Sequence, residues 1–348
     1  MKKIKSFISF LLLLVLILSS GCNQANKVEI EDESNKDEEN IKIVTTLFPQ
    51  YDFAREIAKD KAEVILLLPP GVEAHSFEPT PQDITNIKKS DIFIYTGEYM
   101  EPWAEKIIKN IGDTNTISVD LSSGIELMDE GDDHDHDHDH DHEGDDHDHD
   151  HEEHHEDEEH HEDEEHHHHG GKDPHIWLDP VYAQKMVDDI VESLVKVDST
   201  NEEFYRENGE EYKKKLQELH ESFTETFKKT KHRKIIYGGH FAFGYFAKRY
   251  GLEYISPYNG FTPNAEPTPQ RITELIENMK FTGSKAIYYE ELIDPKVATI
   301  ISEQTGAEML LLHGAHNISK EELEKGVSYI DLMEENLERL KQGLEYIE

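Results

Sequence analysis

The chain has 348 residues, of which 36% are hydrophobic and 9% aromatic, so it is long and apolar enough for two domains with buried cores. Its formal net charge is −41, and removing the 23 acidic side chains of residues 129–171, which contain no Lys or Arg, leaves −18 for the rest. A surface this acidic repels the phosphates of nucleic acids, which excludes a nucleic-acid partner, and it attracts cations.

The N-terminus has the features of a bacterial secretory signal. Three lysines among the first five residues precede an apolar run, residues 7–18, that is too short to cross a membrane comfortably. The run ends in the sequence LSSGC at residues 18–22, which resembles a bacterial lipobox. We therefore expect residues 1–21 to be a signal peptide that is removed, and Cys22 to carry a lipid that anchors the protein on the extracellular face of the cell membrane.

Cys22 is also the only cysteine in the chain. No disulfide can form within the chain and thiolate ligation is excluded, so any metal site must use histidine and carboxylate ligands. Residues 22–40, which follow the lipobox, are polar and acidic with few core-forming side chains, and they predict a disordered tether.

Strands and helices alternate from residue 41 onward. The expected elements are, in chain order, strand 41–48, helix 51–59, strand 62–68, a helix from Pro81, strand 91–95 and helix 102–111. Because strands that alternate with helices build a parallel sheet, residues 41–180 are expected to form an N-terminal α/β lobe.

A low-complexity insertion interrupts this lobe at residues 129–171. It holds 16 of the 23 histidines, mixed with Asp and Glu, and cannot bury a core, so it is predicted to be disordered. Its imidazoles and carboxylates suit weak binding of several metal ions. Our hypothesis is that it captures zinc at the mouth of a cleft; the alternative is a solvated acidic insertion that merely tolerates metal.

Two helices are expected to link this lobe to a second one, over residues 181–230. Asp179-Pro180 opens the first, which reaches about Val197, and residues 198–201 cap a second that runs to about Lys229. Apolar residues recur along the second helix at steps of three and four, which predicts one buried stripe. At 1.5 Å per residue it forms a rod of roughly 40 Å, long enough to cross between lobes, although Gly209 weakens its helix propensity.

The alternation of strands and helices restarts in residues 231–348. The expected elements are strands 234–237, 252–256, 285–289 and 308–312, with helices between them and a last helix from Ser319. Residues 78–85 recur as 266–273 with seven identities in eight, each copy placing Thr at a helix N-cap and Pro at the first helical position. The repeat predicts two lobes of similar topology, with the carboxyl ends of their strands around one cleft.

Seven histidines lie outside the insertion. Two are predicted to be solvated, His220 on the long helix and His232 among basic residues. The other five follow predicted strands: His75, His175, His240, His313 and His316. The first lobe thus offers His75 and His175, and the second offers His240 and one of the last pair, at equivalent positions. Imidazoles that converge without a thiol fit tetrahedral zinc, whereas Mg²⁺ or Ca²⁺ would require oxygen ligands.

Several motifs together resemble the zinc-binding receptors of ABC importers, the ZnuA/AdcA type. They are the lipobox, GVEAHSFEP at residues 71–79, DPHIWLDP at residues 173–180, GHFAF at residues 239–243, and an acidic His-rich loop before the second ligand. The resemblance spans essentially the whole mature chain. It implies two similar α/β lobes joined by a long rigid helix, with zinc bound between them.

The resemblance also implies the ligands. His75, His175 and His240 match the three family histidines, and a histidine rather than a carboxylate at position 240 favours zinc over manganese. The fourth family position is often a carboxylate or water, but the matching loop here reads His313-Gly314-Ala315-His316. We favour His316 over His313 from the register of the loop. Glu78 and Glu266, at equivalent helix starts, are candidates to orient the imidazoles or, alternatively, to pair with the helix N-termini.

The resulting hypothesis is a monomeric receptor, not an enzyme, that passes Zn²⁺ to the permease and ATPase subunits of an importer. One alternative is a zinc hydrolase with three histidines, an open water position and Glu78 as general base, although no HExxH motif is present. The other is a surface adhesin or metal buffer whose working part is the His-rich insertion.

Overall fold

The computed structural model describes residues 40–110, 114–129, 171–258 and 267–348. All of them belong to one unit, Asn40–Glu348. The predictions for the signal peptide, for Cys22 and for the tether lie outside the described residues, and so does the prediction for nearly all of the His-rich insertion.

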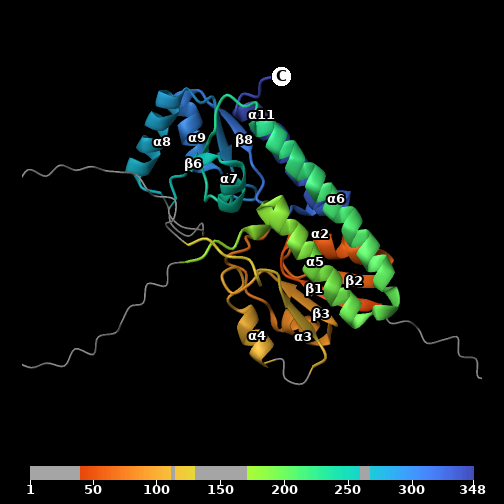
Figure 1. Ribbon diagram of the computed structural model, residues 1–348. Coiled ribbons are helices and arrows are strands. Elements are labelled where there is room, and N and C mark those ends of the chain that lie inside the picture. Colours follow the sequence, from red (N-terminus) through yellow and green to blue (C-terminus); the bar gives the residue numbers. More distant parts are fainter. Residues whose placement is uncertain (1–39, 111–113, 130–170, 259–266) are drawn as a thin grey trace, which may run out of the picture. The chain divides into compact units, whose positions relative to one another are not determined.

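The first lobe is built on a four-stranded parallel sheet (Figure 1). Its strands are β1 (Ile41–Thr45), β2 (Ala62–Leu66), β3 (Ile92–Tyr95) and β4 (Ile117–Asp120), in the order β2-β1-β3-β4. Its helices are α2 (Phe48–Ala58), α3 (Pro81–Lys89) and α4 (Ala104–Asn110). The three expected strands and three expected helices are confirmed. Strand β4 was not predicted, because this short edge strand has only two apolar residues.

The second lobe repeats this chain path. Its strands are β5 (Lys234–Ile236), β6 (Glu253–Ile255), β7 (Ala286–Tyr289) and β8 (Glu308–Leu311), which pair as β5 with β6 and β7 with β8, all in parallel. A single bridge between Tyr237 and Tyr288 joins the two pairs, which gives the order β6-β5-β7-β8. The helices are α7 (Gly244–Tyr250), α8 (Pro269–Thr282) and α9 (Lys296–Thr305). The prediction of two similar parallel-sheet lobes is therefore confirmed.

Two helices, α5 (Pro180–Val197) and α6 (Glu202–Phe227), connect the lobes (Figure 1). Helix α5 begins where the sequence predicts, because the Asp179 side chain accepts a hydrogen bond from the Val181 N–H and Pro180 occupies the first helical position. Gly209 of α6 lies against α5, and a Cβ there would stand 2.5 Å from Cγ2 of Val191. The glycine that weakens the helix locally is thus what lets the two helices approach closely.

The C-terminal segment forms two helices where the sequence predicted one. Helix α10 (Lys320–Lys325) ends at Gly326, whose φ of 72° is left-handed, and Ser328 then caps α11 (Tyr329–Gly343). Helix α11 contacts β8 of the second lobe, α6, and α2 of the first lobe. The C-terminal part of the chain therefore packs against both lobes.

One hydrophobic core runs through both lobes. It contains Phe53 of α2, Trp177 before α5, Phe223 of α6 and Tyr329 of α11, all buried. Burial of such a side chain contributes about 1.5–3 kcal/mol, so the linking helices are held by packing as well as by the chain connections. No helix in the described part of the chain is both long and apolar enough to cross a membrane.

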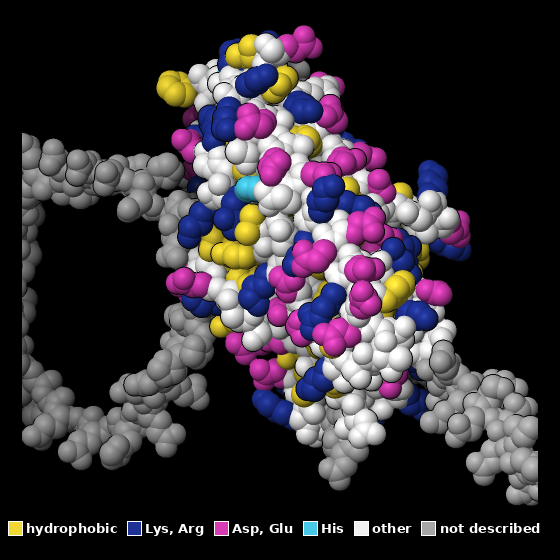
Figure 2. Space-filling model, turned by 45° about the vertical axis from the view of Figure 1, so that its right-hand side comes forward, with side chains coloured by type: hydrophobic (Ala, Val, Ile, Leu, Met, Phe, Trp, Pro, Cys, Tyr) yellow, Lys and Arg dark blue, Asp and Glu magenta, His cyan; other side chains and the backbone are white. Residues whose placement is uncertain are grey.

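The surface of the described residues carries charges of both signs. On the face in Figure 2, Lys and Arg side chains are interspersed with Asp and Glu over much of the area. The face is not a uniform acidic patch, so its charges do not by themselves define a cation-binding surface. A candidate metal site must be sought among specific side chains.

Candidate metal centre

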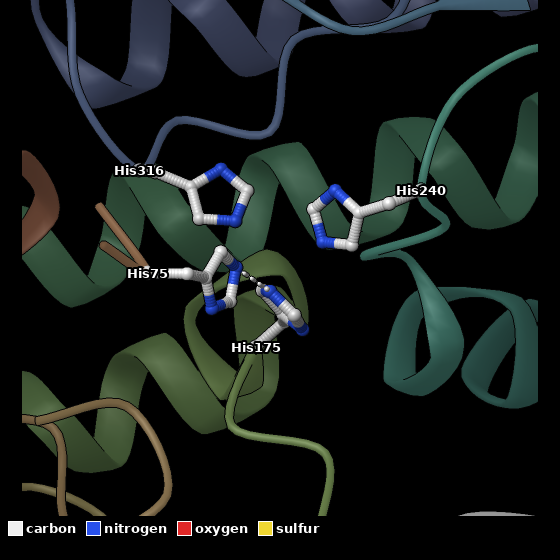
Figure 3. Close-up of side chains that lie close together, drawn as sticks. All are labelled: His75, His175, His240 and His316. Atoms are coloured by element: carbon white, nitrogen blue, oxygen red, sulfur yellow. Dashed lines mark hydrogen bonds between the residues drawn. The ribbon is translucent and has the colours of Figure 1, made fainter. Parts of the chain in front are cut away.

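Four histidines from four separate segments point toward one another (Figure 3). His75 lies in the loop between β2 and α3, His175 just before the short 3₁₀ helix Ile176–Leu178, His240 after β5, and His316 after β8. One ring nitrogen of each lies within 4.8 Å of the others. The sequence analysis singled out these four residues, and the structure brings all of them together.

The four rings surround a common point. Their centroids are 5.0–5.7 Å apart in all six pairs, and the planes are inclined by 47–86° to one another. The shortest contact joins Nε2 of His75 and Nε2 of His175 at 3.3 Å. Since one nitrogen of each of these inclined rings lies within 4.8 Å of the others, four lone pairs can reach a single tetrahedral ion.

The chain holds His175 rigidly through the carboxylate two residues before it. Oδ1 of Asp173 accepts a hydrogen bond from the backbone N–H of His175 at 2.9 Å and lies 2.7 Å from its Nδ1. Asp173 and His175 are both buried. Since a carboxylate accepts the proton of Nδ1, the Nε2 atom is left with its lone pair directed into the cluster.

A second carboxylate holds His240 in the same way. Glu290, the residue after β7, accepts from the backbone N–H of His240 at 3.1 Å and lies 2.8 Å from Nδ1. A Cβ at Gly239 would stand 2.5 Å from Oε1 of Glu290, so only glycine allows the loop to approach the carboxylate this closely. The Gly238-Gly239 turn is therefore a requirement of the site.

The neighbouring carboxylate, Glu291, serves the His316 loop. It accepts from the Gly314 N–H at 2.7 Å and lies 3.4 Å from Nδ1 of His316. Burial alone would raise the pKa of Glu291, but His313, His316 and the Gly314 N–H lower it to about 2. Glu291 is therefore ionised at neutral pH. Three carboxylates, Asp173, Glu290 and Glu291, thus lie around the rings.

Burial disfavours the charged form of two of the four imidazoles, those of His75 and His175. It lowers the pKa of His75 to about 2, with further lowering by His316 and His240. Burial also holds the pKa of His175 well below its usual range, with His316 as the next cause. The buried Nε2 atoms of His240 and His316 make no hydrogen bond among the described residues. Buried ring nitrogens that make no hydrogen bond fit a metal ion, which needs their lone pairs.

The remaining histidines lie elsewhere. His313 is buried beside the cluster, and its Nδ1 accepts from the Ala315 N–H at 3.0 Å. It is therefore His316 that the structure places with His75, His175 and His240. His220 was expected to be solvated, but it is half-buried, with Nδ1 3.0 Å from the Tyr250 hydroxyl. His232, also expected to be solvated, has a buried Nε2 that lies 3.6 Å from Glu345.

The carboxylates that orient the rings were not predicted from the sequence. The predicted candidates were Glu78, which is exposed, and Glu266, which lies outside the described residues. A usable signal was present, since Glu290 and Glu291 directly follow a predicted strand and therefore lie at the same carboxyl edge as the histidines. Asp173 is part of the motif around His175, where it could have been assigned as the partner of the ring.

Comparisons with known proteins give a consistent family. Residues 43–343 match the family model described as zinc-uptake complex component A, periplasmic (ZnuA). The chain is 40% identical over 336 residues to the high-affinity zinc uptake system protein ZnuA of Bacillus subtilis, covering 96% of each chain. It is 31% identical over 342 residues to the zinc-binding lipoprotein AdcA of Streptococcus pneumoniae, covering 98% of this chain and 61% of AdcA, so it spans about three fifths of that relative.

Solved structures agree with the sequence comparisons. The metal-dependent lipoprotein YcdH of Bacillus subtilis aligns with a TM-score of 0.69 and 38% identity, covering 88% of this chain and 99% of that one. The Zn(II)-bound ZnuA-like domain of Streptococcus pneumoniae AdcA aligns with a TM-score of 0.69 and 29% identity, over the same shares of the two chains. With the family model matching residues 43–343, the chain belongs to the ZnuA family of zinc-uptake component A proteins.

Proposed function

We propose that the protein is a receptor that binds one Zn²⁺ ion between its two lobes through His75, His175, His240 and His316. The observation that carries the proposal is the convergence of four imidazole nitrogens within 4.8 Å. Relatives described as zinc uptake and zinc-binding proteins support zinc as the transported ion.

The chemistry of the cluster favours zinc over harder cations. Four imidazole nitrogens complete a tetrahedral site, whereas Mg²⁺ and Ca²⁺ require oxygen ligands. The incoming ion exchanges its water ligands for Nε2 atoms, and Asp173, Glu290 and Glu291 hold three of the rings with Nδ1 turned away. Their negative charges also offset the charge of the ion in a partly buried place.

The receptor role fits this arrangement better than a hydrolase does. Catalytic zinc sites keep an open position for water, and four converging histidines would fill all four positions of a tetrahedral ion. Glu78, the candidate general base, is exposed and outside the cluster. A complete set of protein ligands suits capture and transfer of the ion.

The location of the receptor in the cell is inferred from the sequence alone. Cleavage before Cys22 and lipidation of its thiol would anchor the receptor outside the cell, with residues 22–40 as a tether and residues 129–171 as a zinc-capturing loop. The two lobes would span 41–180 and 231–348, linked by 181–230. A monomer that carries zinc would then dock on the permease of an ABC importer, whose ATPase subunits drive uptake.

Zinc titration of the wild type and of single alanine variants at the four histidines tests the proposal. The wild type should bind one ion tightly. Each variant should lose more affinity than the roughly 10–100-fold that removal of a hydrogen-bond partner of a metal ligand costs. His220→Ala is the matched control, because His220 contacts Tyr250 and lies outside the cluster. Retention of tight binding in the four variants would show that zinc binds elsewhere, and deletion of residues 129–171 would then test the insertion.

A further inference from the structure

The fourth histidine belongs to one lobe by sequence and to the other by its contacts. His316 follows β8 of the second lobe. The loop around it, residues 314–318, nevertheless hydrogen-bonds to the first lobe and to the segment that presents His175. This distribution determines which histidines can stay together when the lobes separate.

Three hydrogen bonds hold the main chain of this loop. The Trp177 indole N–H donates to the Gly314 carbonyl at 2.8 Å, and the Phe48 N–H donates to the His316 carbonyl at 3.1 Å. The Gly71 N–H donates to the Ile318 carbonyl at 2.9 Å. Trp177, Phe48 and Gly71 all precede the linking helices, so they move with the first lobe.

Asn317 adds a side-chain connection at the centre of the loop. Its side chain is fully buried, and Nδ2 donates to the carbonyl of Pro69 at 2.7 Å and to that of Val72 at 2.9 Å. Both acceptors belong to the loop that leads to His75. Since two amide protons satisfy two carbonyls away from water, separation of the loops would leave buried polar groups unpaired.

The main chain of the loop bonds to the second lobe only at its start, and farther along Nδ1 of His316 lies 3.4 Å from Glu291 of that lobe. The His313 N–H and carbonyl pair with the Asn336 side chain, and the Gly314 N–H donates to Glu291. Ala315 then adopts a left-handed φ of 54°, which turns the chain toward the first lobe. His240 differs, because both its backbone N–H and its ring contact Glu290 of the second lobe, whereas the His316 carbonyl bonds to Phe48 of the first lobe and its ring lies 3.4 Å from Glu291.

We propose that His75, His175 and His316 form a three-histidine half-site that stays assembled without zinc because Asn317 fixes the His316 loop to the first lobe, and that His240 is the ligand that moves with the second lobe. The inference rests on the proposed function and deepens it. An ion would first meet three imidazoles and keep one water, which His240 replaces as the lobes close. Release would begin with the loss of His240.

A double-mutant cycle tests this assignment with zinc itself as the probe. Asn317→Leu keeps the approximate volume of the side chain but removes both donors, and it should raise the zinc Kd and the rate of zinc loss to a chelator by about 10–100-fold. His240→Ala should cost less affinity than His316→Ala. The Asn317→Leu factor should be the same in the His240→Ala background, because the half-site is present in both.

Asn208→Leu is the matched control. Asn208 is buried in α6 and donates to the Ile57 carbonyl at 2.9 Å, outside the cluster. Its replacement should lower thermal stability and leave the zinc Kd unchanged. If Asn317→Leu does not fold, Trp177→Phe removes the donor to Gly314 and should have the same effect on Kd in both backgrounds.

Failure of the proposed function and failure of the half-site give different results. A wild type that fails to bind zinc one-to-one contradicts the proposed function. A wild type that binds zinc while Asn317→Leu binds equally well contradicts only the half-site. An Asn317→Leu effect that disappears when His240 is absent also overturns it, since Asn317 would then act through closure onto His240.

Discussion

The two lobes place a carboxylate at the same point of their sheets and use it differently. In the first lobe, Glu101 lies at the carboxyl ends of β1 and β3 and accepts from the N–H groups of Thr96 at 3.0 Å and Gly97 at 3.2 Å, and from the Thr46 hydroxyl. In the second lobe, Glu290 lies at the ends of β5 and β7 and accepts from the backbone and ring of His240. Glu101 therefore accepts hydrogen bonds from the loops at the end of its own sheet, whereas Glu290 orients the ring of a candidate metal ligand.

The comparison shows that shared topology does not place the ligands. The histidines were expected at equivalent positions of the two lobes, but His75 follows the edge strand β2 whereas His240 follows the central strand β5. At the end of β1, where an equivalent of His240 would stand, Thr46 and Gln50 satisfy Glu101 instead. Only His175 and His316, which follow the last strands β4 and β8, correspond.

The largest effect on stability should come from removing the side chain of Glu101 in the first lobe. Glu101→Ala leaves the Thr96 and Gly97 N–H groups and the Thr46 hydroxyl without their acceptor in a buried place. We expect a loss of about 3 kcal/mol in the free energy of unfolding of the metal-free protein, measured by urea denaturation. Zinc affinity should stay close to that of the wild type. If Glu101→Ala binds zinc more weakly but is as stable as the wild type, then Glu101 supports the metal site and not the stability of the first lobe.

Removing the charge of Glu290 should weaken zinc binding and leave the stability of the protein nearly unchanged, the opposite of the result expected for Glu101→Ala. Glu290→Gln keeps the shape of the side chain but weakens the contact with Nδ1 of His240. The zinc Kd should rise about 10–100-fold, which is about 1.4–2.7 kcal/mol, with little change in the stability of the metal-free protein. Glu303→Gln, on the exposed side of α9, is the control in the same lobe. Wild-type affinity in Glu290→Gln would mean that the tautomer of His240 is fixed by another contact.

Much of the fold could be predicted because its signals are local. Asp179-Pro180 combines an N-cap residue with a proline at the first helical position, and α5 begins there. The break between α10 and α11 was missed although Gly326 and Ser328 are end and start signals, because the apolar pattern continues across them. Strand β4 was missed because its pairing with β3, and not its composition, makes it a strand.

The site was predictable at the level of its histidines but not of their partners. Histidines in loops after strands can be found along the sequence, since the carboxyl ends of parallel strands meet. Which carboxylate meets which ring depends on side-chain geometry between segments, as for Glu290 and His240, 50 residues apart. The hydrogen bonds of Asn317 to Pro69 and Val72 span more than 240 residues and leave no local pattern.

Acid should distinguish the two buried environments in the metal-free protein. The pKa of His75 falls from 6.5 to about 2 on folding, so below about pH 6.5 the unfolded chain binds a proton that the folded chain does not. His75 therefore makes the protein less stable as pH falls, by up to about 1.4 kcal/mol per pH unit. Glu101 acts in the opposite direction, because burial raises its pKa to about 7 and its protonation stabilises the fold between about pH 7 and 4.5.

Comparison of the wild type with His75→Gln isolates the histidine, because both proteins contain Glu101. The difference in the free energy of unfolding, wild type minus variant, should decrease steadily from pH 6.5 to 5 and stay constant from pH 7.5 to 8.5. Urea denaturation at each pH, with zinc removed by a chelator, provides the values. A difference that does not change with pH would show that His75 is protonated in the folded protein.

The smallest effects should come from the repeated helix starts, where the lobes are most alike. Thr80 accepts from the Asp83 N–H at 3.3 Å, and Thr268 accepts from the Arg271 N–H at 3.3 Å. The one mismatch in the repeat gives α3 two further bonds, since Asp83 also accepts from the Thr80 N–H at 2.8 Å and from the Thr80 hydroxyl at 2.7 Å. Thr268→Ala should therefore cost about 1 kcal/mol of unfolding free energy, and Thr80→Ala less, because the bond from the backbone N–H of residue 80 to Asp83 survives the loss of the hydroxyl. Urea denaturation of both metal-free variants measures the difference, and a larger loss at Thr80 would contradict it.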